Sequence, residues 1–279
     1  MIDLAVTPQH LYSARHIVAK WTTSDGSAME DRTGTGFFVV HEGAVFLVTN
    51  RHLLDLEYVN KKYVGATLSG LSVRGFDLCE HRSEHEATYC FESPSPIFGR
   101  DNDDVAVIPA SGAKICDGQH CAISNYYDSE LLARRGEFES DDRAESIVAT
   151  DVLAICGFPG LDGQVQQERP TAMIGFIASD PRYRPNPLPQ LEEGRDIRSE
   201  NVILYQGFSR SGSSGSPMLA VQRGLHLGGA LSGPPSRSIR LVGINAGRIK
   251  GSSSHPSALS YGVRSDSILE TIERAAATV

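Results

Sequence analysis

The sequence predicts an all-β fold, either a sandwich or a barrel. Most apolar segments are short and rich in β-branched residues, and Gly, Asn, Asp or Pro separates one from the next. Helical periodicity is scarce. Glycine accounts for 27 of the 279 residues, which exceeds the usual ~7% and fits a chain with many turns.

The strand pattern recurs along the whole chain. Its segments are HIVAKW (16–21), TGFFVVHEGAVFLVTN (35–50), VAVIPA (105–110), DVLAICGF (151–158), AMIGFIAS (172–179), SPMLAV (216–221), RLVGINAG (240–247) and LSYGVR (259–264). Within the second segment, FFVVHEGAVFLV predicts a hairpin that turns at His41, Glu42 and Gly43.

Two short stretches favour helices. In residues 265–277, the apolar residues Ile268, Leu269 and Ile272 lie on one face, and Ser265 is a candidate N-cap. Residues 129–135 are the second candidate.

Two polar stretches favour loops. The acidic residues 136–146 predict a solvated surface loop. Residues 180–200, which are rich in Pro and Arg, predict an irregular excursion that is either a functional lid or disordered.

Composition narrows the classes of partner and location. A net charge of −8 argues against nucleic acid or an anionic membrane as the main partner. The longest apolar runs, such as VFLV and VLAIC, are too short to span a bilayer, and the acidic N-terminus lacks the apolar core of a secretory signal. An odd number of cysteines without a framework spacing predicts reduced thiols and a cytoplasmic location. The cysteines are Cys79, Cys90, Cys116, Cys121 and Cys156.

The segment with the most chemical information is SRSGSSGSP, residues 209–217. Small residues on both sides of a serine expose its hydroxyl and let backbone amides turn toward one point, as an oxyanion hole requires. A flexible linker is the alternative interpretation, but this segment runs directly into an apolar strand. We therefore predict that Ser214 is a nucleophile.

A nucleophilic serine needs a base and an acid that orients the base. His52 directly follows the apolar strand AVFLVTN, and Asp104 opens the apolar run VAVIPA. The neighbouring Asp101 and Asp103 are expected to be solvated. The order His52, Asp104, Ser214 differs from that of subtilisins and α/β-hydrolases, and the G-x-S-x-G elbow is missing, which disfavours an esterase or lipase.

The segments around these residues resemble the trypsin-like (chymotrypsin-fold) serine peptidases, closest to the HtrA/Deg type. The matching blocks are TGTGF (33–37), TNRH (49–52), DVAV (104–107), AICGFPG (154–160), GSSGSP (212–217) and VGIN (242–245). Three catalytic motifs in the family's order, about 50 and about 110 residues apart, make the match specific. It covers about residues 14–275.

The resemblance implies an all-β fold of two packed six-stranded antiparallel β-barrels with a C-terminal helix, forming a single unit over residues 1–279. The parts would be an N-terminal barrel (about 14–125, with His52 and Asp104), a C-terminal barrel (about 147–264, with Ser214) and the helix (265–279).

The implied activity is that of a serine endopeptidase. Ser214 would attack a peptide carbonyl, while His52 takes its proton and Asp104 holds the imidazole. The oxyanion hole would comprise Gly212, Ser213 and Ser214, with the amides of Gly212 and Ser214 as donors.

The resemblance also places the substrate. A bound peptide would lie along Ala246, Gly247 and Arg248 as an antiparallel strand, and Phe208 would line the floor of the specificity pocket. Since no carboxylate is there, we expect small or medium apolar side chains rather than Arg or Lys. The expected partners are a protein or peptide substrate and an activating or regulatory protein, with no cofactor, no metal, no nucleic acid and no membrane.

The chain departs from the family in two respects. Digestive relatives carry an Asp before the serine, which pairs with a newly cut N-terminus, whereas this chain has Ser213. We therefore expect activation by a partner or by ordering of the 180–200 loop, not by propeptide cleavage. Only a helix fits after residue 264, so no PDZ module is expected. A catalytically silent scaffold that binds partner proteins through the same cleft is the alternative function.

A metal site is the remaining alternative interpretation of the cysteines and histidines. The ligand types suit Zn²⁺ in two groups, Cys79, His81, His85 and Cys90, and Cys116, His120 and Cys121. The spacing C-x-H-x₃-H-x₄-C matches no recognised zinc finger, so buried thiols and surface histidines are the preferred interpretation.

Overall fold

The hairpin that the sequence predicts at residues 35–50 is present at the centre of the first sheet. In the computed structural model, β2 (Arg32–His41) and β3 (Ala44–Thr49) pair antiparallel, with His41 opposite Ala44. Glu42 and Gly43 have φ angles of 49° and 81°. This left-handed conformation at both turn positions suits the right-handed twist of the two strands.

The first sheet contains nine strands. The structure describes residues 6–79, 83–117, 123–142, 146–160, 169–186, 190–191, 196–207, 209–223, 237–251 and 257–278. The spatial order is β6-β7-β3-β2-β1-β4-β5-β8, and β9 pairs with β2 in parallel. Besides β2 and β3, the strands are β1 (Ala14–Thr22), β4 (Thr67–Cys79), β5 (Ser83–Glu92), β6 (Ile97–Phe98), β7 (Ala106–Pro109), β8 (Lys114–Asp117) and β9 (Tyr127–Asp128).

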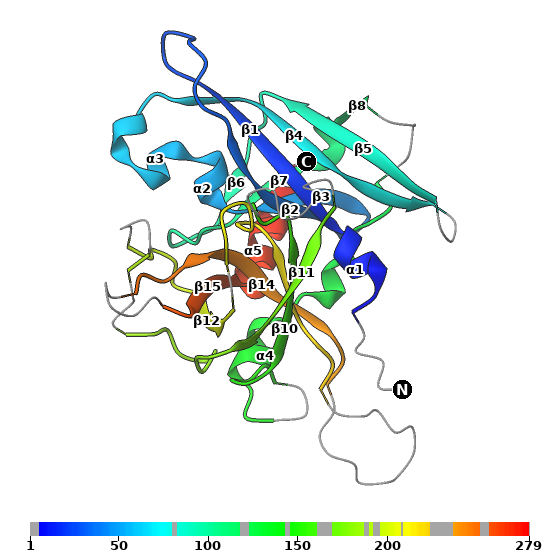
Figure 1. Cartoon of the computed structure of the whole chain (residues 1–279), viewed down its shortest axis with the longest axis vertical. Coiled ribbons are helices and arrows are strands. Elements are labelled where there is room, and N and C mark those ends of the chain that lie inside the picture. The colour runs from blue at the N-terminus through cyan, green and yellow to red at the C-terminus, as the bar shows by residue number, and fades with distance from the viewer. Residues whose placement is uncertain are drawn as a thin grey trace.

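The second sheet is a closed barrel of six antiparallel strands in the order β10-β11-β12-β15-β14-β13. Its strands are β10 (Val152–Gly157), β11 (Thr171–Ile177), β12 (Val202–Gln206), β13 (Pro217–Ala220), β14 (Arg240–Arg248) and β15 (Leu259–Arg264). Figure 1 shows this barrel beneath the first sheet.

The C-terminal helix α5 (Ser265–Ala276) joins the two sheets, because it packs against β7 of the first sheet and β14 of the barrel. Ile268 and Ile272 are fully buried, as their spacing predicts. Ser265 is not the N-cap that we expected: it is the first helical residue, and its hydroxyl donates to the carbonyl of Ala133 at 2.7 Å.

The remaining helices are short. They are α1 (Pro8–Tyr12), α2 (Arg51–Leu54), α3 (Leu56–Val59) and α4 (Arg135–Glu139), with single 3₁₀ turns at Lys61–Tyr63, Ala110–Gly112 and Ser129–Leu131. The helix expected at 129–135 is therefore wrong in extent, because a 3₁₀ turn occupies its start and α4 begins only at its end. The solvated loop expected at 136–146 is also partly wrong, since Phe138 on α4 is fully buried.

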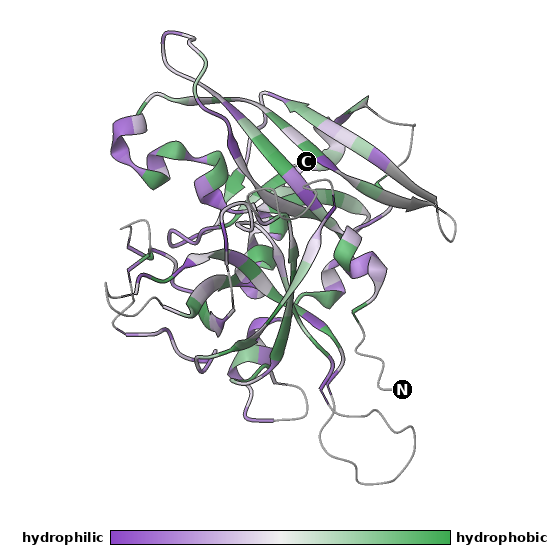
Figure 2. Ribbon diagram, in the orientation of Figure 1, coloured by the Kyte–Doolittle hydropathy of each residue, from purple (hydrophilic) through white to green (hydrophobic). Residues whose placement is uncertain are grey.

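Hydrophobic side chains form one core in each sheet and a third between them. The third core combines residues of the first sheet, such as Phe37 and Val48, with Leu219 and Ile244 of the barrel and Ile268 of α5. Figure 2 shows the hydrophobic residues along the strands and hydrophilic residues in many connecting segments. Val105, which directly follows Asp104, belongs to this shared core.

The all-β fold class with a C-terminal helix is confirmed. Each segment predicted as a strand forms one, and the hairpin segment forms two. The first sheet has nine strands, whereas the resemblance implied six. The sequence pattern missed five of them, which are β4, β5, β6, β8 and β9. The division into barrels at about 14–125 and 147–264 stays a prediction.

The cysteines differ from the expected reduced thiols. Cys90 on β5 and Cys116 on β8 form a disulfide, while Cys156 is a buried free thiol. Burial raises the pKa of the Cys156 thiol to about 12. In the zinc alternative, His81, His120 and Cys121 and the side chains of Cys79 and His85 lie outside the described residues. The residues that the structure describes contain no group of three or more candidate metal ligands. Within the same residues, no helix has the length and apolar character needed to cross a bilayer.

Candidate catalytic site

His52 and Asp104, which lie 52 positions apart in the sequence, are joined by two hydrogen bonds. His52 lies on the single-turn helix α2, directly after β3, and Asp104 lies two residues before β7, which pairs with β3. The His52 amide donates to Asp104 Oδ1 at 2.8 Å, and His52 Nδ1 lies 2.7 Å from Asp104 Oδ2. The Asp104 side chain is 1% exposed and the His52 side chain 10%. The pair is thus oriented and shielded from water.

Three further contacts hold the Asp104 segment. The Asn50 side chain donates to the carbonyl of Asp104 at 2.8 Å, and the Asp104 amide donates to the hydroxyl of Ser199 at 2.9 Å. The hydroxyl of Tyr261 on β15 lies 3.4 Å from Asp104 Oδ2. Sequence reasoning missed Ser199 and Tyr261, because both come from distant segments and neither stands in a catalytic motif.

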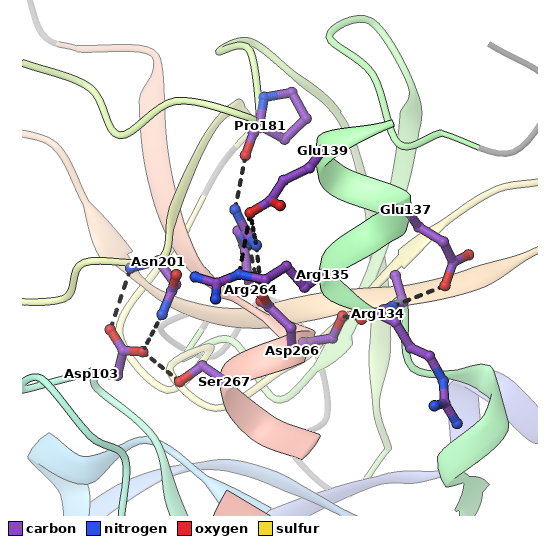
Figure 3. A network of polar contacts seen from close by, with 12 residues as sticks. Asp103, Arg134, Arg135, Glu137, Glu139, Pro181, Asn201, Arg264, Asp266 and Ser267 are labelled. Atoms are coloured by element: carbon purple, nitrogen blue, oxygen red, sulfur yellow. Dashed lines mark hydrogen bonds and ion pairs between the residues drawn. The ribbon is translucent and has the colours of Figure 1, made fainter. Parts of the chain in front are cut away.

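Asp103 is buried, although we expected it to be solvated. Its carboxylate accepts hydrogen bonds from the Glu200 amide at 3.0 Å, the Asn201 side chain at 2.9 Å and the Ser267 hydroxyl at 2.5 Å. Figure 3 shows it between Asn201 and Ser267 of α5. The end of the 180–200 loop is therefore fastened beside Asp104.

The base of α5 carries a second set of contacts in the same view. Arg264 pairs with Asp266, donates to the carbonyl of Pro181 at 3.2 Å and approaches Glu139 to 4.0 Å (Figure 3). The start of the 180–200 loop is thus bound to Arg264 at the end of β15, and its end is bound to Asp103 and Asp104, just before β7.

The serine loop lies against the first sheet. The amide of Thr35 on β2 donates to the carbonyl of Ser214 at 2.7 Å, and the Thr35 hydroxyl donates to the carbonyl of Gly212 at 2.8 Å. Gly34 lies between Ser214 and Leu53, the residue after His52, and a Cβ there would collide with the Leu53 side chain. The structure therefore brings the serine loop beside the helix that carries His52.

The amides of Gly212 and Ser214 donate no hydrogen bond within the described part of the chain. Gly212 has a φ angle of +85°, which favours glycine. A Cβ there would also lie 3.1 Å from the amide nitrogen of Gly160. Two unpaired amides on either side of one residue are the donor arrangement of an oxyanion hole.

Ser213, grouped with the oxyanion hole from the sequence, has a different role. Its amide donates to the carbonyl of Arg210 at 3.0 Å, and its side chain is fully buried. It is not one of the two free donors.

The Ser214 hydroxyl makes no hydrogen bond to His52 or to any other described residue. Catalytic hydrogen bonds are often long in a substrate-free enzyme and tighten in the complex. Of the three residues predicted to act together, the structure therefore joins two directly and brings the third close through its backbone.

The residues predicted to bind substrate are described in part. Ala246, Gly247 and Arg248 form the end of β14, where a register shift between Asn245 and Gly247 interrupts the pairing with β15. Ala246 is buried, whereas Gly247 and Arg248 are half-buried. Phe208 lies outside the described residues.

Neither the protein-family models nor the curated protein sequences include a match. Among solved structures, a crystal structure of Deg5 is similar, with 18% sequence identity and a TM-score of 0.47 over 93% of this chain and 87% of that chain.

Proposed function

We propose that this chain is a serine endopeptidase that cleaves protein or peptide substrates through an acyl-enzyme intermediate. The observation that carries the proposal is the buried Asp104 carboxylate, which binds both the amide and the ring of His52. A buried carboxylate oriented onto a histidine beside a glycine-rich serine loop is the arrangement that activates a serine nucleophile.

The contacts assign a task to each group. Because His52 Nδ1 faces a carboxylate, Nδ1 carries the ring proton and Nε2 is left to accept the proton of Ser214. The Asp104 carboxylate then stabilises the imidazolium that forms, and His52 passes the proton to the leaving amine.

The amides of Gly212 and Ser214 would bind the oxyanion of the tetrahedral intermediate. Loss of one such donor costs about 10²- to 10³-fold in kcat. Both amides belong to a loop that the Thr35 backbone and side chain hold in place, so the donors are preorganised.

The substrate class is a peptide in extended conformation. The end of β14, residues 246–248, is the candidate strand partner, and Phe208 is the candidate floor of the pocket. The enzyme is proposed to prefer small or medium apolar side chains at the cleaved position. Cleavage of a peptide library after Arg or Lys would contradict this preference.

A switch is part of the proposal, because this chain has Ser213 where digestive relatives carry the Asp that pairs with a newly cut N-terminus. The 180–200 loop is the candidate ordering element, since the Ser199 hydroxyl accepts a hydrogen bond from the Asp104 amide and the Glu200 amide donates one to Asp103. A binding partner that shifts this loop would change the hydrogen bonds that hold Asp103 and Asp104 in place. Full activity after deletion of residues 185–195 would remove the loop from this role.

The competing function is a catalytically silent scaffold, which the missing Ser214–His52 hydrogen bond favours. A fluorophosphonate probe separates the two, because it reacts only with an activated serine. Labelling of the wild type that is lost in Ser214→Ala supports the peptidase. A folded wild type that stays unlabelled, with and without cell extract as a source of activator, contradicts it. N-terminal peptide profiling of cells that express the two variants would then identify the substrates.

A further inference from the structure

Asn245 on β14 contacts the serine loop through both its backbone and its side chain. Its carbonyl accepts from the Gly215 amide, and its amide donates to the carbonyl of Ser216, each at 2.8 Å. Its side-chain nitrogen donates to the carbonyl of Ser213 at 2.7 Å. Asn245 is fully buried, so these contacts are shielded from competition with water.

Tyr205 of β12 orients the Asn245 side chain. The Tyr205 hydroxyl donates to Asn245 Oδ1 at 2.7 Å and is itself fully buried. Burial raises the pKa of Tyr205 above its ordinary value, which keeps the phenol protonated as a donor. With Oδ1 directed at Tyr205, the Asn245 amide nitrogen must face the serine loop, where the hydroxyls of Ser209 and Ser213 also lie within 3.1 Å.

The bond from Asn245 to Ser213 determines the direction of the next amide. The Ser213 carbonyl and the Ser214 amide belong to one planar trans peptide, so they point in opposite directions. With the carbonyl turned inward to Asn245, the Ser214 N–H faces the opposite side, where it meets no acceptor among the described residues. The Gly160 amide acts likewise on the Ser211 carbonyl, at 2.6 Å, and so orients the Gly212 N–H.

We propose that Asn245, held by Tyr205, is a positioning residue that keeps the Ser214 amide directed at the developing oxyanion. It touches neither substrate nor reacting atoms. The effect of Asn245 on catalysis rests on the proposed peptidase function. Asn245 and Tyr205 are neutral, buried side chains of the barrel. Their hydrogen bonds therefore fix the conformation of the serine loop as part of the fold.

Two variants and a matched control test the role. Asn245→Leu removes the donor at similar volume, and Tyr205→Phe removes only the hydroxyl that orients it. Asn125→Leu is the control, because Asn125 is also buried and donates its side-chain amide to a carbonyl, that of Phe76, at 2.8 Å. It lies outside the serine loop.

Steady-state kinetics provide the first readout. We expect kcat to fall by about 10²-fold in Asn245→Leu, the lower end of the loss for one oxyanion donor, with KM little changed. Tyr205→Phe should show a smaller fall in kcat, whereas Asn125→Leu should lose thermal stability and retain kcat. Equal kcat in folded Asn245→Leu and Asn125→Leu would overturn the proposal.

An NMR measurement keeps the test independent of activity. In substrate-free protein labelled with ¹⁵N-serine, the Ser214 amide resonance should move in Asn245→Leu and Tyr205→Phe and stay in place in Asn125→Leu. An unmoved resonance in both site variants would refute the role of Asn245 even if the enzyme is active. A wild type that no substrate or fluorophosphonate probe engages would refute the peptidase function instead, and the resonance would still decide the positioning role. If Asn245→Leu does not fold, Tyr205→Phe alone decides.

Discussion

The hydroxyl of Thr35 donates a 2.8 Å hydrogen bond to the carbonyl of Gly212, so a strand of the first sheet holds the loop that carries Ser214. The same hydroxyl accepts from the Phe158 amide at 3.0 Å, and Thr35 is fully buried. One side chain thus connects the first sheet, the end of β10 and the serine loop. The two halves of the proposed catalytic apparatus are aligned across this contact.

Replacing Thr35 by Val should misplace the serine loop while keeping the volume of the side chain. We expect kcat to fall roughly 10- to 100-fold, because a displacement of about 1 Å can have that effect. The free energy of unfolding should fall by about 2 kcal/mol, since two buried backbone groups lose a partner. Thr35→Ser keeps the hydroxyl and should retain most of kcat. Equal loss in Thr35→Val and Thr35→Ser would show that packing, and not the hydrogen bond, matters.

Substitutions of the neighbouring carboxylates Asp103 and Asp104 should affect different properties, namely the free energy of unfolding and kcat. Asp104→Asn should lower kcat by about 10⁴-fold, because an amide no longer favours the required tautomer of His52. Asp103→Asn should keep most of kcat but lower the free energy of unfolding by about 2 kcal/mol, since hydrogen bonds to a charged group are lost. Urea unfolding and steady-state kinetics on both variants provide the comparison. The pattern would be contradicted if Asp103→Asn were the less active of the two.

The contrast between these carboxylates shows how far the sequence could predict the site. Asp104 was predicted because it opens a buried strand, which is a local signal. Asp103 was expected to be solvated because its partners in the 196–201 segment and α5 lie 97 or more positions away. The role of Thr35 was also not predictable. Its motif, TGTGF, matches the family, but its hydrogen-bond partner Gly212 lies 177 positions along the chain. Motifs identify reacting groups, while the groups that hold them depend on tertiary contacts.

The sequence pattern missed strand β5 for a related reason. Strand β5 reads SEHEATYCFE, in which Ala87, Tyr89 and Phe91 are buried and alternate with polar residues. Its first half, SEHE, is so polar that it shows no apolar run, and the segment was interpreted as surface histidines and buried thiols. Strands β10, β13 and β15 are clear in the sequence, because each contains a continuous run of residues that is buried on both faces.

The Cys90–Cys116 disulfide should stabilise the first sheet without affecting catalysis. The two cysteines lie 26 positions apart, and closing a loop of that size is worth about 3 kcal/mol. Cys116→Ser should therefore lower the free energy of unfolding by about that amount and leave kcat unchanged. Dithiothreitol should reduce the stability of the wild type to that of the variant and leave the variant as it was.

The disulfide also bears on the cytoplasmic location predicted from the sequence, because cytosolic thiols are normally kept reduced. Alkylation of thiols in intact cells before lysis decides the matter. Modified Cys116 in wild-type protein would indicate a reducing compartment, and Cys116 that is modified only after reduction would contradict the predicted location.

The stability of the fold should fall in mild acid because of His16. Burial, with the charge of Arg74 as a smaller cause, lowers the pKa of His16 below 6.5 in the folded protein. The unfolded chain therefore takes up a proton first as the pH drops below about 6.5, which shifts the equilibrium toward unfolding. His10 has its pKa lowered by burial and acts in the same direction.

The free energy of unfolding should decrease between pH 7 and pH 5, less steeply in His16→Gln. Arg74→Gln should also reduce the slope, because Arg74 lies opposite His16 on β4 and its removal raises the pKa of His16. Identical slopes for wild type and His16→Gln would assign the acid sensitivity to other groups.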